Sequence, residues 1–221
     1  MRAQSASLGR LTERPPPEDL VEETIVLGGR DLAILRPRDS EALLDEEAFE
    51  HEEFLPYWAE LWPSSLALAR ALAGRSLRGA RTVELGCGLG LPSIAAALAG
   101  ARVLATDWSP DAVAALAANA ERNGVALETL VCSWTEPGPL LDRAPWDLVL
   151  AADVLYEARN AEALLVLLPR LGREALIADP GRPAAERFLA AAGDGWTVTR
   201  SRAPELRNGA IHRLRQLRAA T

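Results

Sequence analysis

Three alternating glycines and two carboxylates carry the strongest chemical signal in this chain. Gly86, Gly88 and Gly90 come directly after a predicted strand, and Glu84 precedes them. Glycines at this spacing let the backbone turn tightly and approach a ligand closely. Asp107 ends the next predicted strand, 21 residues after Gly86, where a carboxylate can accept both hydroxyls of a ribose. The pattern predicts a site for an adenosine-containing cofactor.

The glycine spacing argues against a nicotinamide-dependent dehydrogenase. That class has the pattern G-x-G-x-x-G, and Leu91 stands at its third glycine position. The observed acid followed by G-x-G-x-G resembles the first motif of class I S-adenosylmethionine-dependent methyltransferases. The resemblance implies S-adenosyl-L-methionine as cofactor and S-adenosyl-L-homocysteine as product. The cofactor-binding residues that it implies here are Glu84, Gly86, Cys87, Gly88, Gly90 and Asp107.

Three further segments point to one branch of that superfamily. They are PYWAELWPSS at 56–65, DVLY at 153–156 and DPGRP at 179–183. The first two resemble the lysine-methyltransferase-like branch of the seven-strand methyltransferases. The third, with Pro-Tyr-Trp, resembles the electron-transfer-flavoprotein β-subunit lysine methyltransferases and their bacterial relatives. The match covers about Pro56 to Pro183 and implies that the acceptor is a lysine side chain of a protein partner.

The resemblance also assigns aromatic residues to the cofactor. Trp62 precedes a helix-starting proline and is expected to cover the cofactor. Trp108 and the pair Ser133–Trp134 are expected at the adenine. Many relatives have a carboxylate where this chain has Ser133, so the expected adenine contact is stacking by Trp134 together with backbone hydrogen bonds. The alternative for Trp108 and Trp134 is packing in the core.

Asp153 is the residue predicted to serve the chemistry. It ends a predicted strand beside the expected cofactor, where a carboxylate can hold and orient a lysine amine. That amine has an ordinary pKa of about 10.4, so it must lose a proton before it attacks. Tyr156 lies three residues further on and is predicted to hydrogen-bond beside it, in both catalysis and substrate binding. The alternative is that Asp153 caps the following helix.

Three more residues are predicted to bind the substrate or to shape its approach. Tyr57 and Trp58 are expected to line the entrance, the alternative being a hydrophobic lid that closes the sheet edge. Arg182 is expected to steer an acidic part of a protein substrate. The alternative for Arg182 is a plain loop with a solvated side chain.

Composition limits the partners. The 221 residues carry 24 basic and 31 acidic side chains, a net charge of −7, which disfavours nucleic acid. The acidic run at 41–53 agrees with a cationic acceptor. All 24 basic residues are arginine, which excludes Schiff-base catalysis by this chain and is typical of a GC-rich bacterium. No apolar run approaches the roughly 18 residues of a membrane span.

Two cysteines, Cys87 and Cys132, predict a reduced, cytoplasmic protein. One predicted strand lies between theirs, so we expect no disulfide. His51 and His212 are isolated in sequence, so we expect no metal site either. We expect a monomer.

The elements that must position these residues alternate between strand and helix. We expect a Rossmann-like, doubly wound and mostly parallel seven-stranded sheet with an antiparallel C-terminal pair. Strands are predicted at Arg81–Leu85, Arg102–Thr106, Leu127–Cys132, Asp147–Ala152, Glu174–Ala178, Trp196–Arg200 and Ile211–Leu214. Helices are predicted at Ser64–Ala73, Leu91–Ala99, Pro110–Asn123, Ala158–Leu171 and Ala184–Ala192.

Two parts of the chain are expected. Residues 1–55 form an N-terminal extension with a disordered start, a hairpin at Thr24–Leu35 and the acidic run. Residues 56–221 form the methyltransferase domain. Alternatives to a protein-lysine methyltransferase are a small-molecule N-methyltransferase of the nicotinamide type, a cofactor-binding module without catalysis, and an L11-type methyltransferase, which needs a separate substrate domain. A closed pocket for one ring would favour the first alternative, and an open groove ending at Asp153 would favour a protein.

Overall fold

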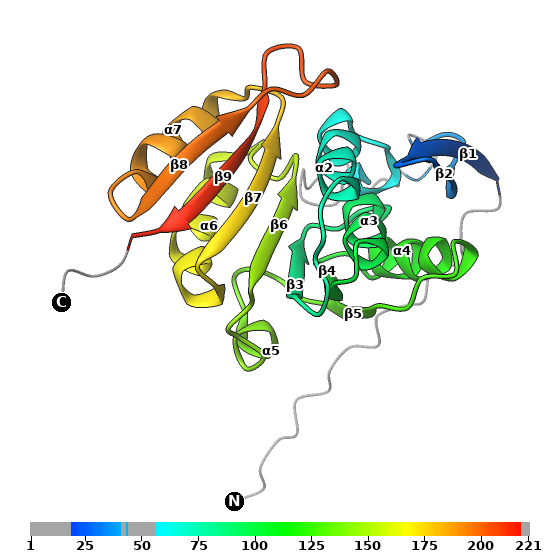
Figure 1. Ribbon diagram of the computed structural model, residues 1–221, viewed down its shortest axis with the longest axis horizontal. Coiled ribbons are helices and arrows are strands. Elements are labelled where there is room, and N and C mark those ends of the chain that lie inside the picture. The colour runs from blue at the N-terminus through cyan, green and yellow to red at the C-terminus, as the bar shows by residue number, and fades with distance from the viewer. Residues whose placement is uncertain (1–18, 41–42, 44–55, 218–221) are drawn as a thin grey trace, which may run out of the picture.

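The computed structural model describes residues 19–40, 43 and 56–217 and is built around one seven-stranded sheet (Figure 1). The strand order is β5-β4-β3-β6-β7-β9-β8. The five strands from β5 to β7 are parallel, and β9 pairs antiparallel with both β7 and β8. The strands are β3 (Arg81–Leu85), β4 (Arg102–Asp107), β5 (Glu128–Val131), β6 (Leu148–Ala152), β7 (Glu174–Asp179), β8 (Trp196–Ser201) and β9 (Ala210–Gln216).

Helices cover both faces of the sheet because alternate strand residues point to opposite sides. In β6, Val149 and Ala151 belong to one hydrophobic cluster, and Leu148 and Leu150 belong to the other. The first cluster packs under α5, α6 and α7, and the second packs under α2 and α3. The helices are α2 (Pro63–Ala73), α3 (Leu91–Leu98), α4 (Pro110–Arg122), α5 (Gly138–Leu141), α6 (Ala158–Leu171) and α7 (Pro183–Ala192).

This architecture confirms the predicted doubly wound sheet and its closing antiparallel pair. The main helices begin within one residue of the predicted positions. Ser109 caps α4, since its hydroxyl accepts from the Ala112 N–H at 3.3 Å, and Pro110 is the first helical residue. The four-residue helix α5 and a 3-10 turn at Tyr57–Ala59 were not predicted. Both are shorter than the periodic pattern that reveals a helix.

The predicted N-terminal hairpin is confirmed and is longer than expected. Strands β1 (Leu20–Leu27) and β2 (Arg30–Pro37) pair antiparallel, and the turn is Gly28–Gly29. Both glycines have positive φ, +58° and +82°, as the two central residues of a tight hairpin turn require. The hairpin is a separate two-stranded sheet that lies beside α4 in Figure 1.

Two asparagines of the α4 C-terminal end attach the hairpin. Asn119 accepts from the Leu35 N–H at 2.7 Å and donates to the Leu35 carbonyl at 3.1 Å. Asn123 makes the same pair of bonds with Ala33, at 3.0 and 2.8 Å. The two side-chain amides thus occupy hydrogen-bonding positions that a third strand would take on β2. Asn119 also donates to the Leu89 carbonyl at 3.1 Å.

The strand order confirms the reasoning about the cysteines. Cys87 follows β3 and Cys132 follows β5, and β4 lies between those strands. Both thiols are buried and free. Within the described ranges, no helix has the length and apolar character to cross a bilayer. Almost all of the acidic run at 41–53 and the start of the chain lie outside the described residues.

Candidate functional site

A cavity of about 430 Å³ opens where β3, β4 and β6 end. This carboxyl edge of a parallel sheet is where such folds bind ligands. Its wall comes from the loops after those strands and after β5, from the segment before α2 and from the start of α6. The volume lies within the range of small-molecule sites, about 300–1,000 Å³.

The glycine loop after β3 forms the floor of the cavity. Gly86 and Gly88 line it and have positive φ, +69° and +49°. A Cβ on Gly86 would lie 2.9 Å from the Val154 side chain, so only glycine fits there without a shift. At Gly88 a Cβ would face the Trp58 carbonyl at 3.3 Å. The loop therefore presents bare backbone to the cavity.

Asp107 ends β4 and supports the same loop. It is 5% exposed and lines the cavity. Its Oδ2 accepts from the Gly88 N–H at 3.0 Å, and its Oδ1 accepts from the Ser109 N–H at 3.0 Å. Burial raises the pKa of Asp107, and these backbone donors oppose that rise. Trp108 is a third backbone donor to this carboxylate, so about one of its four acceptor positions remains for a ligand hydroxyl.

Glu84 lies behind the loop, in β3. It is 1% exposed and its Oε2 accepts a short hydrogen bond from the Ser93 hydroxyl of α3, while Oε1 has no partner. Burial raises the pKa of Glu84 to about 8. The side chain therefore joins β3 to α3 as a largely protonated carboxyl at neutral pH.

Aromatic residues form the outer rim. Tyr57, Trp108 and Tyr156 are 41%, 45% and 38% exposed, so the cavity opens to solvent. The rings of Tyr57 and Tyr156 lie 5.3 Å apart, and those of Tyr57 and Trp62 lie 6.4 Å apart. The Trp62 indole N–H donates to the Tyr57 carbonyl at 2.7 Å, which closes the segment before α2 into a compact turn.

Trp108 and Trp134, for which packing in the core was the alternative to a place at the adenine, differ in their surroundings. Trp108 is too exposed for a core residue, so core packing is wrong for it. Trp134 does both, because it packs against the core cluster of the α6 face and also lines the cavity. A Cβ on Gly86 would lie 3.7 Å from its ring, which places the ring beside the glycine loop.

Asp153 directly follows β6 and has a strained, left-handed backbone conformation. Among the described residues it is the one non-glycine residue with positive φ, at +59°. Such a conformation costs about 1–2 kcal/mol and persists where the surroundings hold it. The side chain is 5% exposed and lines the cavity. Helix α6 begins at Ala158 with no side-chain cap, so the helix-cap alternative for Asp153 is wrong.

Two side chains from distant elements hold the Asp153 carboxylate. Arg182, at the start of α7, donates to Oδ1 from Nε at 2.8 Å and from Nη2 at 2.6 Å. Ser64, in the first turn of α2, donates to Oδ2 at 3.0 Å and is fully buried. The Arg182 backbone N–H in turn donates to Asp179 Oδ1 at 2.8 Å, which fixes the turn that carries the guanidinium.

Comparison with known proteins decides the family. A family model described as lysine methyltransferase matches residues 55–186, more than half of the 221-residue chain. The chain belongs to this lysine methyltransferase family. The predicted membership, drawn from the motifs at 56–65, 84–90 and 153–156, is confirmed.

Individual proteins similar to this chain are also protein methyltransferases. The electron transfer flavoprotein beta subunit lysine methyltransferase of Xenopus laevis is 38% identical over 139 residues, 58% of this chain and 53% of that protein. The histone-arginine methyltransferase METTL23 of Xenopus laevis is 33% identical over 116 residues, half of each chain. The chain thus spans about half the length of the curated relatives it matches.

Solved structures show the same fold. The 16S rRNA N2 G1207 methyltransferase of T. thermophilus, solved with AdoMet and guanosine, has a TM-score of 0.66 at 16% identity. The likeness covers 92% of this chain and 52% of that one. At this identity it speaks for the fold alone.

Most predicted site residues of this lysine methyltransferase family member meet at the cavity. Those that line it are Tyr57, Trp58, Trp62, Gly86, Gly88, Asp107, Trp108, Ser133, Trp134, Asp153 and Tyr156. Those that do not are Glu84, Cys87, Gly90 and Arg182. The Cys87 side chain packs against Ala105 and Leu116. Gly90, at the start of α3, faces the Leu116 side chain of α4. Cofactor contacts for all these residues stay predictions.

Arg182 departs most from its expected surroundings. We predicted that it steers a substrate, with a solvated loop side chain as the alternative, whereas its guanidinium is paired with Asp153. Sequence analysis also missed Ser64, Thr135, Arg159 and Asn160. Thr135, Arg159 and Asn160 line the cavity. Asn160, in the first turn of α6, follows closely on the DVLY segment, and that closeness in sequence was the available signal. Burial raises the pKa of Tyr156, and a side-chain hydrogen bond with Asn160 opposes that rise.

Proposed function

We propose that this chain is an S-adenosylmethionine-dependent methyltransferase that modifies a lysine side chain of a protein. The observation that carries the proposal is the placement of Asp153. Its carboxylate lines the same cavity as the glycine loop and Asp107. One cavity therefore contains both the residues suited to bind the cofactor and a carboxylate suited to bind the substrate amine. Both relatives named above are protein methyltransferases, which supports methyl transfer over a dehydrogenase or a module without catalysis. The family model and the flavoprotein-subunit methyltransferase support lysine as the acceptor.

The residues of the cavity fit the cofactor. Gly86 and Gly88 offer backbone where a Cβ would intrude, and Asp107 keeps acceptor capacity for a ribose hydroxyl. Trp108 and Trp134 line the cavity and offer rings to an adenine. Ser133 and Thr135, whose hydroxyls lie 2.8 Å apart, offer polar contacts at its edge. When bound, S-adenosylmethionine supplies the methyl group on its sulfonium and leaves as S-adenosylhomocysteine.

The chain's own part in the reaction is to align a neutral amine. Displacement at a methyl carbon needs the nucleophile in line behind it, so positioning supplies most of the rate. Asp153 accepts a hydrogen bond from the amine and directs its lone pair towards the cofactor side of the cavity. Tyr156 and Tyr57 contact the aliphatic part of the substrate lysine. Their tilted rings, with centroids 5.3 Å apart, form one apolar wall near the surface.

The open rim favours a protein acceptor over a single-ring metabolite. Three rim aromatics are exposed by about two-fifths each, 41%, 45% and 38%, as a site reached by a surface side chain requires. The electron transfer flavoprotein β subunit is the acceptor that we propose to test, because a methyltransferase of that protein is 38% identical here. We further propose that the protein is a cytoplasmic monomer from a bacterium and that it binds neither nucleic acid nor membrane.

The test uses tritiated S-adenosylmethionine with a lysate of cells in which the gene is deleted, so that acceptor sites are unmodified. This chain contains no lysine, so labelled lysine belongs to the acceptor. We expect one labelled protein band, at the size of the flavoprotein subunit, and none with an Asp153→Asn variant. Label confined to small molecules would replace the proposal with a metabolite methyltransferase. Cofactor binding without any transfer would leave only a binding module.

A further inference from the structure

Resting on the proposed function, we propose that Arg182 is a positioning residue that neutralises Asp153, so that the carboxylate receives the acceptor as a neutral amine and does not hold it as an ammonium ion. The inference deepens the role of the same site. It starts from the ion pair between Arg182 and Asp153, which joins residues 29 positions apart at the edge of the cavity.

The hydrogen-bond inventory of Asp153 leaves a specific place for an amine. A carboxylate offers about four lone-pair positions, two on each oxygen. Arg182 fills both on Oδ1 with Nε and Nη2, and Ser64 fills one on Oδ2. One acceptor position on Oδ2 therefore remains. A single position orients one N–H of an incoming amine and leaves its lone pair free.

Charge decides the form in which the amine is held. A lone buried carboxylate within about 4–6 Å of an amine favours the ammonium form and raises the amine's pKa by about 1–3 units. An ammonium has no lone pair, so such a carboxylate would bind the substrate tightly in an unreactive state. The guanidinium on Oδ1 cancels most of this field, while Oδ2 keeps its ability to accept a hydrogen bond.

Other charged groups near the pair do not replace Arg182. Asp179, at the end of β7, lies close enough that the Asp153 charge contributes to the raised pKa of Asp179, although burial is the main cause. Across the cavity, Arg159 forms an ion pair with Glu157, and Asp107 is bonded to the glycine loop. Tyr57 and Tyr156 line the rim of the cavity. Arg182 is the residue whose guanidinium forms an ion pair with Asp153.

Local structure fixes the guanidinium where it is needed. Gly181, with φ +97°, and Asp179 form the turn before α7, and Asp179 Oδ1 accepts from both Gly181 N–H at 2.7 Å and Arg182 N–H at 2.8 Å. The Arg182 side chain is 34% exposed, against 5% for Asp153. The carboxylate is thus largely removed from water, which strengthens the interaction, while the arginine side chain keeps about a third of its surface in solvent.

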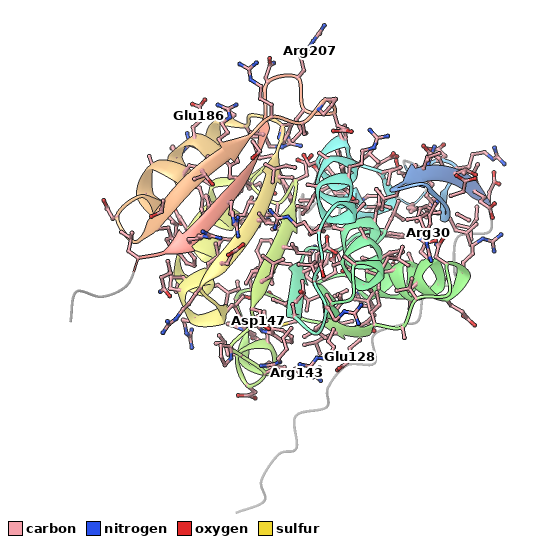
Figure 2. All side chains as sticks on the ribbon, viewed as in Figure 1. Arg30, Glu128, Arg143, Asp147, Glu186 and Arg207 are labelled. Carbon is pink, nitrogen blue, oxygen red and sulfur yellow. The ribbon has the colours of Figure 1, made fainter. Side chains whose placement is uncertain are left out.

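The experiment compares wild type, Arg182→Gln and Arg182→Lys. Initial rates of tritium transfer to protein in the gene-deleted lysate are measured at saturating cofactor, from about pH 6 to about pH 10. The stability of the acceptor protein sets these limits. Gel separation keeps label on the lysine introduced by Arg182→Lys apart from the acceptor. Arg143→Gln is the matched control, because Arg143 pairs with exposed Glu128 at the amino end of β5, whereas the cavity lies at the carboxyl ends of the parallel strands. Figure 2 labels Arg143 and Glu128 close together. Melting temperature and S-adenosylhomocysteine affinity confirm that each variant is folded.

We expect Arg182→Gln to move the acid limb of the rate profile upward by about one pH unit or more, a loss of about tenfold near neutral pH that shrinks at high pH. Arg182→Lys keeps the charge and is expected to keep most of the wild-type limb. A loss of rate equal at every pH, or an unmoved limb in folded Arg182→Gln, would overturn the inference. Wild type without transfer at any pH would overturn the proposed function instead.

Discussion

The backbone N–H of Gly88 donates to Oδ2 of Asp107 at 3.0 Å, across the gap between the β3 loop and the end of β4. The other oxygen of Asp107 accepts from the Ser109 N–H at 3.0 Å, just before α4. One carboxylate thus sets the shape of the glycine loop and also faces the cavity. Loop geometry and cofactor recognition therefore depend on the same charge.

Asp107→Asn is expected to weaken cofactor binding. An asparagine has one carbonyl oxygen, so it can accept from Gly88 or from Ser109, and its NH₂ group opposes the other donor. Hydrogen bonds to a charged group contribute about 1.5–3 kcal/mol, which corresponds to a loss of roughly tenfold or more. Calorimetric titration with S-adenosylhomocysteine measures it. Glu128→Gln, on an exposed side chain at the amino end of β5, is the control. An unchanged dissociation constant for Asp107→Asn would remove the residue from the cofactor site.

Asp153→Asn is expected to abolish turnover and to leave cofactor affinity within a few-fold of wild type. Loss of a positioned acid–base or orienting group typically costs about 10²–10⁴ in rate. Asparagine is the right replacement because it tolerates the left-handed backbone that φ +59° imposes. Asp153→Ala adds a backbone cost of about 1–2 kcal/mol, so its lower stability would confuse the result. Retained turnover in Asp153→Asn would mean that the carboxylate has no chemical role.

Glu84 predicts a pH dependence of stability. Folding raises its pKa from the ordinary 4.5 to about 8, chiefly through burial. Below pH 4.5 the carboxyl is protonated in both the folded and unfolded states. Between that pH and about 8 the unfolded chain releases the proton while the folded chain keeps it, so the free energy of unfolding falls as pH rises.

Glu84→Gln lacks this contribution. Between about pH 5 and about pH 8, the range spanned by the shift in the Glu84 pKa, the melting temperature of wild type is therefore expected to fall further than that of Glu84→Gln. The expected difference is at least about 2–4 °C, which is what about 1 kcal/mol produces in a chain of this size. Parallel curves for the two proteins would show that the carboxyl is ionised in the folded state at neutral pH.

Gly90→Ala is expected to destabilise the fold more than Gly124→Ala. Both glycines have positive φ, +85° and +65°. A Cβ on Gly90 would lie 2.4 Å from the Leu116 side chain, whereas a Cβ on Gly124 meets nothing within 4 Å. Gly124→Ala isolates the backbone cost of about 1–2 kcal/mol, and overpacking adds about 1–3 kcal/mol at Gly90. Urea unfolding of both variants tests the difference, and equal losses would mean that Leu116 moves aside freely.

Much of the fold was predictable because its signals are local. The Ser109–Pro110 helix start, the Gly28–Gly29 turn and the glycine loop each need only neighbouring residues to be recognised. Helix α5 was missed because four residues carry no helical period. The attachment of the hairpin through Asn119 and Asn123 was missed because an asparagine in a helix has no pattern that names a distant backbone partner.

The sequence predicted most of the residues that line the site, but it did not predict the contacts that these residues make with one another. Parallel topology brings the ends of β3, β4 and β6 together, so Gly86, Asp107 and Asp153 were predicted to meet. The pairing of Asp153 with Arg182 and Ser64 depends on side-chain directions across 29 and 89 positions of the chain. No spacing rule reaches that far. The positive φ of Asp153 was equally invisible, because aspartate at the end of a strand is common without it.

Asn119 bonds at once to the hairpin at Leu35 and to the glycine loop at Leu89, and its side chain is fully buried. One amide group therefore bridges the two regions, and we expect ligand binding at the loop and docking of the hairpin to be coupled through it. A ligand that orders the glycine loop lowers the free energy of the intact Asn119 contacts, and an intact hairpin strengthens ligand binding by the same factor. The N-terminal hairpin, which is bonded to Asn119 and Asn123 at the C-terminal end of α4, is thus expected to contribute to affinity from a distance.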